Sequence, residues 1–84
     1  MYKLYIVSEN EEEVISKLSN LIAARGLSIL TIYAQPLNDR KTLSSLEITL
    51  EIPENKVANL REKLLQIVPI REVRVFKITE VIFE

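Results

Sequence analysis

The residues of this 84-residue chain that could do chemistry are carboxylates gathered in one short segment. Glu9, Glu11, Glu12 and Glu13 lie close together, and neighbouring carboxylates can divide the roles of acid and base in catalysis. The sequence contains no His and no Cys. The commonest general base, the thiolate nucleophile and the thiolate ligands of zinc and iron–sulfur sites are therefore excluded. We expect a non-enzymatic chain with no catalytic residues, metal or cofactor of its own.

The glutamate segment has the features of a helix start. Residues 8–25 show helical spacing of apolar positions, and either Ser8 with Glu11 or Asn10 with Glu13 would form a capping box. Carboxylates in a first turn are stabilised by the positive end of the helix dipole. We therefore interpret the glutamates as a solvated helix start and not as an acid–base pair. The apolar stripe of this helix comprises Val14, Ile15, Leu18, Leu21 and Ile22.

Gly26 is the only glycine in the chain, and it directly follows Arg25. The residue after a helix often adopts a left-handed conformation, which glycine reaches without a steric penalty. Arg25 lies in the expected last turn, where its side chain can bond to free carbonyl groups. We predict that Gly26 ends the first helix.

The rest of the chain shows strand patterns and one further helix. Alternating, β-branched and aromatic residues predict strands. Pro53 predicts the start of the second helix, because a first-turn residue needs no N–H donor, and Pro69 predicts its end. The expected strands are residues 2–7, 27–34, 43–52 and 70–78, and a turn is expected at residues 35–42.

The order β-α-β-β-α-β predicts an α+β, ferredoxin-like fold, in which two helices pack on one face of a four-stranded antiparallel sheet. Right-handed crossovers place the first and third strands in the centre of that sheet. We expect a single domain over residues 1–84, in which residues 79–84 form a C-terminal tail.

The second strand, expected at residues 27–34, would lie at an edge of the sheet. Lys, Pro or a bulge normally blunts such an edge, and this segment is apolar and uncharged over its length. We predict that it pairs with its own copy across a two-fold axis; the alternative is that the first helix and the following turn shield it. The predicted homodimer interface comprises Gly26, Leu27, Ile29, Leu30, Thr31, Ile32 and Tyr33.

Other functions of such a scaffold are disfavoured by charge. Eleven basic and twelve acidic residues leave a net charge of -1, whereas a nucleic-acid binder usually has a basic face. The solvated face of the third strand carries Glu47 and Glu51 where an RNA-binding sheet would place aromatic residues. No apolar run is long enough to cross a membrane, and no signal peptide is visible. We expect a cytoplasmic protein that binds neither nucleic acid nor membrane.

Two segments, LIAARGLSILTIYA and LLQIVPIREVRV, carry a family resemblance. Over about residues 4–78 the chain resembles the ACT domain, and within that family the short regulatory (small) subunits of acetolactate synthase, also called acetohydroxyacid synthase. In those proteins an apolar helix ends in Arg-Gly before the second strand, and a second apolar helix precedes a valine-rich strand. The matching positions are Arg25, Gly26, Leu27, Ile29, Leu64, Ile67, Val68, Ile70, Val73 and Val75.

The resemblance implies a non-catalytic regulatory subunit that forms a side-by-side homodimer. It also implies a larger partner, the thiamine-diphosphate-dependent catalytic subunit of acetolactate synthase, and a place in branched-chain amino-acid biosynthesis. The contact surface could include Lys3, Tyr5 and Glu47, or the tail segment Val81-Ile82-Phe83. The alternative is a stand-alone ACT-type sensor of an amino acid or another small molecule.

The resemblance further implies an amino-acid effector site at Asn10, Glu13 and Ser28. Effector-binding relatives usually carry Asp or Asn where this chain has Asn10, and glycine where it has Glu13. Ser28 replaces the asparagine that commonly follows the Arg-Gly pair. A carboxylate ligand would meet the like charges of the glutamates, so we expect weak or absent valine binding in the manner of those relatives.

Overall fold

The computed structural model describes residues 1–78, and its helices and strands follow the predicted order. The expected tail, residues 79–84, lies outside the described residues, and so does its segment Val81-Ile82-Phe83. The elements are β1 (Tyr2–Ser8), α1 (Glu11–Ala24), β2 (Ile29–Pro36), β3 (Ser44–Leu50), α2 (Glu54–Leu65) and β4 (Ile70–Lys77).

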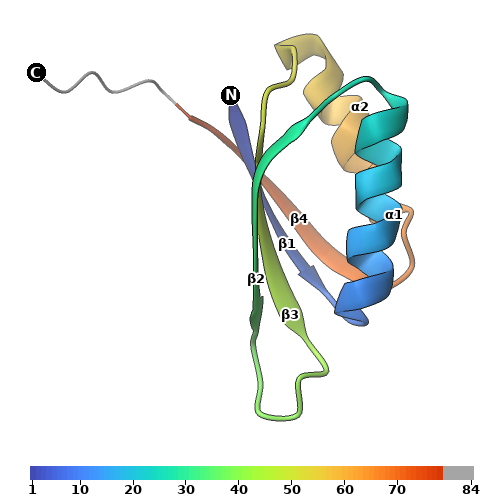
Figure 1. Ribbon diagram of the computed structural model, residues 1–84, viewed down its shortest axis with the longest axis vertical. Helices are drawn as coiled ribbons and strands as arrows, with labels where there is room; N and C mark the ends of the chain where they lie inside the picture. Colours follow the sequence, from blue (N-terminus) through green and yellow to red (C-terminus); the bar gives the residue numbers. More distant parts are fainter. Residues whose placement is uncertain (79–84) are drawn as a thin grey trace, which may run out of the picture.

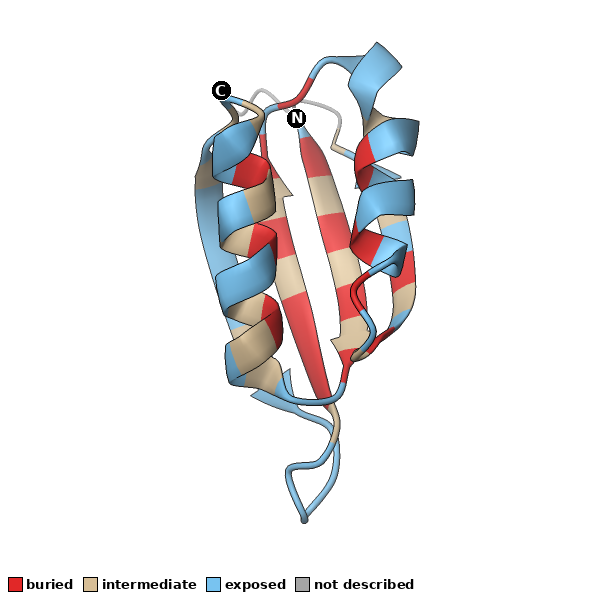
Figure 2. Ribbon diagram, turned by 90° about the vertical axis from the view of Figure 1, so that its right-hand side faces the viewer, coloured by how far each residue is buried: buried red, intermediate tan, exposed pale blue. Residues whose placement is uncertain are grey.

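The four strands form one antiparallel sheet in the order β2-β3-β1-β4. Both helices lie against the same face of this sheet, and no described element covers the opposite face (Figures 1 and 2). β1 and β3 are central and β2 and β4 are edges, as right-handed crossovers require. The predicted ferredoxin-like βαββαβ fold is therefore confirmed.

The hydrophobic core lies between the two helices and the central strands (Figure 2). Alternate residues of β1 and β3 point toward the helices, because successive side chains of a strand point to opposite faces. Each helix presents apolar residues at helical spacing toward them. Full burial of one Leu or Ile side chain stabilises the fold by about 1.5–3 kcal/mol. The most deeply buried core residues are Leu4, Ile6, Val14, Leu18, Ile22, Leu46, Ile48, Leu50, Leu60 and Leu64.

Helix α1 begins after Asn10, and neither predicted capping box forms. Asn10 has a left-handed backbone with φ of 50°, and its side chain makes no capping hydrogen bond. Its Nδ2 donates instead to Oε2 of Glu13 at 2.8 Å. Oγ of Ser44 donates to Oε2 of Glu11 at 2.9 Å. The capping boxes are absent because both glutamate side chains accept hydrogen bonds from side chains, and not from the backbone of the first turn.

Gly26 ends the last turn of α1 as predicted. Its φ is 70°, in the left-handed region, and its N–H donates to the Ala23 carbonyl at 2.9 Å. The Leu27 N–H donates to the Ile22 carbonyl at 3.2 Å, and Leu27 packs against the core. These two bonds and this contact form a Schellman motif. Nη1 of Arg25 donates to the Leu21 carbonyl at 3.3 Å, which confirms the carbonyl contact expected for Arg25.

Helix α2 ends earlier than the sequence pattern indicates. Its last residue is Leu65, four positions before Pro69, and Pro53 lies just outside its first turn as the N-cap. A proline ring clashes with the carbonyl four residues earlier, which here belongs to Leu65. The N–H groups of Gln66 and Ile67 donate to the Lys63 and Leu64 carbonyls, and these shorter-range bonds tighten the end of the helix.

Strand β2 lies two residues later in the chain than the predicted strand. It spans Ile29–Pro36, and its register against β3 shifts between Ile29 and Thr31, so that Leu30 is an extra residue. The bulge was not expected in residues 27–34, and that part of the edge prediction was wrong, whereas Pro36 lies beyond the predicted segment. A bulge stands at one end of the edge and Pro36 at the other, which leaves Thr31–Gln35 as the regular part. We call these five residues the free edge.

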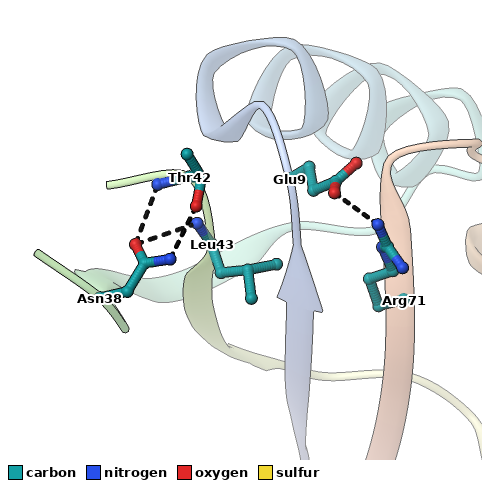
Figure 3. A network of polar contacts seen from close by, with 5 residues as sticks. All are labelled: Glu9, Asn38, Thr42, Leu43 and Arg71. Atoms are coloured by element: carbon teal, nitrogen blue, oxygen red, sulfur yellow. Dashed lines mark hydrogen bonds and ion pairs between the residues drawn. The ribbon is translucent and has the colours of Figure 1, made fainter. Parts of the chain in front are cut away.

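The loop between β2 and β3 is closed by Asn38 (Figure 3). Its Oδ1 accepts from the N–H of Thr42 at 2.9 Å, and its Nδ2 donates to Oγ1 of Thr42 at 2.6 Å. The Leu37 N–H donates to the Leu43 carbonyl at 2.8 Å. An Asn side chain that bonds to nearby backbone is a recurrent turn device, and the predicted hairpin is confirmed.

Candidate effector site and dimer surface

The free edge of β2 exposes apolar side chains. Ile32 is 43% exposed and Tyr33 60%, and they are flanked by the bulged Leu30 at 50% and by Leu37, just after the strand, at 46%. Only one side of β2 is paired, with β3, because β2 is the end of the sheet. The other side carries backbone N–H and C=O groups that no described strand uses, which is the arrangement that permits pairing with another strand.

The predicted interface residues divide between this edge and the turn before it. Leu30, Thr31, Ile32 and Tyr33 lie in β2 and are exposed. Three other residues are placed differently. Gly26 and Leu27 lie in the turn after α1, where Leu27 packs against the core, and Ile29 is half-buried before the bulge.

The uncovered face of the sheet carries a row of aromatic and charged residues. Tyr33, Glu47, Tyr5 and Arg74 lie directly beside one another across β2, β3, β1 and β4. Lys3 lies in the adjacent row, between Thr49 and Phe76. Their neighbours along each strand point toward the helices. The contact residues expected from the resemblance, Lys3, Tyr5 and Glu47, therefore share one face.

The turn between β1 and α1 brings two predicted effector residues together. Asn10 bonds to Glu13 across the first turn of α1 at 2.8 Å, and Nζ of Lys17 donates to the other carboxylate oxygen of Glu13 at 2.7 Å. Both carboxylate oxygens of Glu13 are therefore bonded within the chain. The side-chain amide of Asn10 is already used within the chain.

Ser28 does not join this pair within one chain. Asn10 precedes α1 and Ser28 follows it. A 14-residue helix is about 21 Å long at 1.5 Å per residue. A ligand that touches Asn10 and Ser28 together would need a second copy of the chain to supply one of them.

Two buried serines lie beneath the same turn. Ser8 and Ser44 are paired across β1 and β3, and each is almost fully buried. Ser44 donates to Glu11, whereas Oγ of Ser8 has no hydrogen-bond partner among the described residues. A buried hydroxyl without a partner costs about 1–3 kcal/mol. The sequence contained one signal for this position, because Ser8 continues the core-facing alternation of Tyr2, Leu4 and Ile6.

The turn is also fixed to the start of β4. The Glu9 N–H donates to the Pro69 carbonyl at 2.9 Å, and the Glu9 carboxylate forms an ion pair with Arg71 (Figure 3). Both side chains of the pair are substantially exposed, so the pair contributes at most about 1 kcal/mol. The backbone bond and the ion pair join the same two elements, which are distant in sequence.

The described residues contain no group of three or more His, Cys, Asp or Glu that could hold a metal ion. Within residues 1–78, no helix is long and apolar enough to cross a membrane.

Glu11, Glu12 and Glu13 all lie in the first turn of α1, as predicted. Glu11 accepts a hydrogen bond from Ser44, and Glu13 accepts hydrogen bonds from Asn10 and Lys17.

No family model matches the sequence, and no curated protein matches it. Solved structures do resemble it. The ACT domain of a GTP pyrophosphokinase from Chlorobium tepidum is 17% identical with a TM-score of 0.70, and the match covers 89% of this chain and 95% of that one. The acetolactate synthase small subunit from Thermotoga maritima is 22% identical with a TM-score of 0.73, and the match covers 88% of this chain and 45% of that one.

The C-terminal domain of the MgtC protein from Mycobacterium tuberculosis is similar to the same degree. It is 15% identical with a TM-score of 0.73, and the match covers 89% of this chain and 83% of that one. At such identities, structural likeness establishes the fold and leaves function to be argued from sites. The chain therefore has the ferredoxin-like βαββαβ fold of ACT domains.

Proposed function

We propose that this chain is a non-catalytic regulatory subunit, which dimerises through β2 and acts by contact on the thiamine-diphosphate-dependent catalytic subunit of acetolactate synthase. The observation that carries the proposal is the free edge of β2, where Ile32 and Tyr33 are exposed, next to the bulged Leu30, on the side of the strand that no described strand pairs with. Such an edge fits a second copy of itself, because antiparallel pairing about a two-fold axis uses the same residues twice.

The geometry of this dimer follows from the free edge. Thr31–Gln35 would pair with the same residues of the second copy, with the two-fold axis near Tyr33, the middle residue of the segment. The two sheets would then form one continuous sheet, with the helices of both copies on one face. The opposite face would present two copies of the row that contains Tyr5 and Glu47, which we propose contacts the catalytic subunit.

The structural likeness to an acetolactate synthase small subunit supports this choice of partner. The test is to mix the purified chain with an acetolactate synthase catalytic subunit from the same organism and to measure binding and acetolactate formation. We expect a stable complex and a higher rate. Tyr5→Lys should weaken both, whereas Lys63→Gln, a change at the exposed end of α2, should not. An unchanged rate together with no complex would refute the assignment.

A small-molecule sensor is the second candidate, and the buried Ser8 hydroxyl favours it. This group has no partner among the described residues and lies beside Ser44, whose own hydroxyl is bonded to Glu11 at the start of α1. A ligand that reached this cluster could complete its hydrogen bonds. A thermal-shift screen of amino acids and neutral metabolites on the chain alone distinguishes the candidates, because stabilisation without a protein partner supports a sensor.

We expect valine to bind weakly or not at all, whether the chain is a regulatory subunit or a small-molecule sensor. Glu13 lies across the turn, held by Asn10 and Lys17, and its charge opposes a ligand carboxylate. Isothermal titration with valine should show no micromolar binding to the native chain. Glu13→Gly, which removes both the charge and the side chain, should raise the affinity. Micromolar binding by the native chain that Asn10→Ala abolishes would contradict this expectation.

A further inference from the structure

A cavity lies at the other end of α1, away from the turn that contains Asn10. It has a volume of about 340 Å³ and is lined by Arg25, Asn55, Lys56 and Asn59. Arg25 is the C-cap of α1, and the other three residues lie in the first half of α2. Because α1 ends at the same end of the molecule at which α2 begins (Figure 1), the two helices both contribute to its wall.

All four side chains that line the cavity can donate hydrogen bonds, and none is acidic. The guanidinium and the ammonium carry two positive charges, and the two carboxamides are neutral donors and acceptors. Asn55 and Asn59 are four positions apart on α2, and Lys56 and Asn59 are three apart. Residues at these spacings lie on the same side of a helix, so the three can face one ligand together.

The two cations of the cavity are not neutralised within the described chain. Arg25 and Lys56, like most of the basic residues, form no ion pair with any of residues 1–78, where only Lys17, Arg71 and Arg74 pair with a carboxylate. Arg25 is held in place by its bond to the Leu21 carbonyl, which uses one donor of Nη1. A guanidinium has five donors in a planar fork, so the remaining donors are available to a ligand.

We propose that this cavity binds a small dianion, such as a phosphate monoester or a short dicarboxylate. Two unit charges match two cations, and the guanidinium fork suits the paired oxygens of phosphate and carboxylate groups. The volume lies at the lower end of the range for small-molecule sites, about 300–1,000 Å³. The proposal goes beyond the regulatory role above and does not rest on it, because that role is carried by the free edge of β2, which contributes no residue to the cavity.

Isotope-labelled full-length chain should be titrated with three probes at matched ionic strength: inorganic phosphate at pH 8, malonate and chloride. We expect phosphate or malonate to shift the amide resonances of Arg25, Asn55 and Asn59, with a dissociation constant on the order of 1 mM. Chloride should leave them unchanged. Preference for phosphate assigns a phosphate monoester as the ligand class, and preference for malonate assigns a dicarboxylate. Equal responses to all three probes would refute the site.

Lys56→Gln removes one of the two positive charges and should weaken binding by roughly three- to tenfold, because the attraction between an exposed cation and an anion in contact is modest in water. Lys63→Gln is the matched control, because it removes the same charge from the other end of α2 and should leave the affinity unchanged. Raising the salt concentration should weaken binding to the native chain through screening. Equal affinity of the native chain and Lys56→Gln, or equal weakening by Lys63→Gln, would overturn the proposal.

Discussion

The two edge strands of the sheet, β4 and β2, differ in the side chains that they expose. β4 carries Arg71, Arg74 and Lys77, all exposed, among its apolar residues. β2 carries no charged residue and instead exposes Leu30, Ile32 and Tyr33. Charges at an edge oppose pairing with another strand because pairing would desolvate them. The difference favours β2 over β4 as the edge for the proposed pairing.

The segments that precede β4 and β2 also differ in the contacts that attach each strand to the rest of the chain. β4 follows Pro69, and its start is joined to the β1–α1 turn by the bond from Glu9 to the Pro69 carbonyl and by the Glu9–Arg71 pair. β2 follows the left-handed Gly26, and a bulge at Leu30 separates its first residue from the free edge. The start of β4 is thus tied to the β1–α1 turn by a backbone bond and an ion pair, whereas β2 pairs with β3 and packs Ile29 and Ala34 against the core.

A charge placed in the free edge should give the largest effect. Ile32→Lys would bring two ammonium groups close together across the two-fold axis and desolvate both, so we expect the dimer dissociation constant to rise by about 100-fold or more. Light scattering over a concentration series measures it. Leu37→Lys is the control, because Leu37 is similarly exposed but lies beyond Pro36. If the native chain is monomeric at micromolar concentration, β2 does not pair with a second copy and the proposed difference between β2 and β4 fails.

The converse change should make β4 resemble β2. Arg74→Val combined with Lys77→Val removes two exposed charges from the edge, and we expect species larger than a dimer in sedimentation velocity. Lys17→Val combined with Lys63→Val removes the same charge from the helices and serves as the control. If both double variants associate equally, net charge and not the edge is responsible.

Changing the turn before β2 should have a moderate effect on stability. Gly26→Ala places a Cβ at φ of 70°, which costs about 1–2 kcal/mol, and Gly26→Asn should cost less because Asn tolerates this region. No atom lies within 4 Å of the added Cβ, so the cost is conformational and not steric crowding. Urea unfolding of the three proteins gives the free energies. Equal stability of Gly26→Ala and the native chain would contradict the helix-end role.

The ion pair that fixes β4 should give the smallest effect. Arg71→Ala should lower the free energy of unfolding by about 0.2–1 kcal/mol, and high salt should remove the difference. Arg40→Ala in the β2–β3 loop is the control, since Arg40 forms no ion pair among the described residues. A loss well above 1 kcal/mol for Arg71→Ala would show that the turn depends on the side chain more than on the Glu9 backbone bond.

The sequence predicted the parts of this molecule that depend on periodicity. Leu46, Ile48 and Leu50 alternate along β3 and all face the core, because a strand with one buried face must alternate. Gly26 was predictable because few other residues adopt a left-handed helix end without strain. The element order then determined the sheet topology through the handedness of its crossovers.

The details of β2 and of the β1–α1 turn were not predictable in the same way. The segment before Thr31 is apolar at nearly every position, so alternation could not show that Leu30 is bulged or where the strand begins. Asn10 and Glu13 had the types of a capping box, but their side chains bond to each other. Which partner a side chain bonds to depends on neighbouring side chains such as Lys17 and on tertiary contacts. The sequence pattern alone does not contain this information.

The charged edge of β4 has a consequence for how far assembly can proceed. In the terms of polymer chemistry, a molecule with two reactive ends forms chains, and a molecule with one reactive end forms pairs and stops. If two copies pair through β2 as proposed, the exposed charges Arg71, Arg74 and Lys77 on β4 would make each copy a monofunctional unit for sheet extension. Raising the concentration would then increase the number of pairs and not their length, so the degree of polymerisation through strand edges would stay at two.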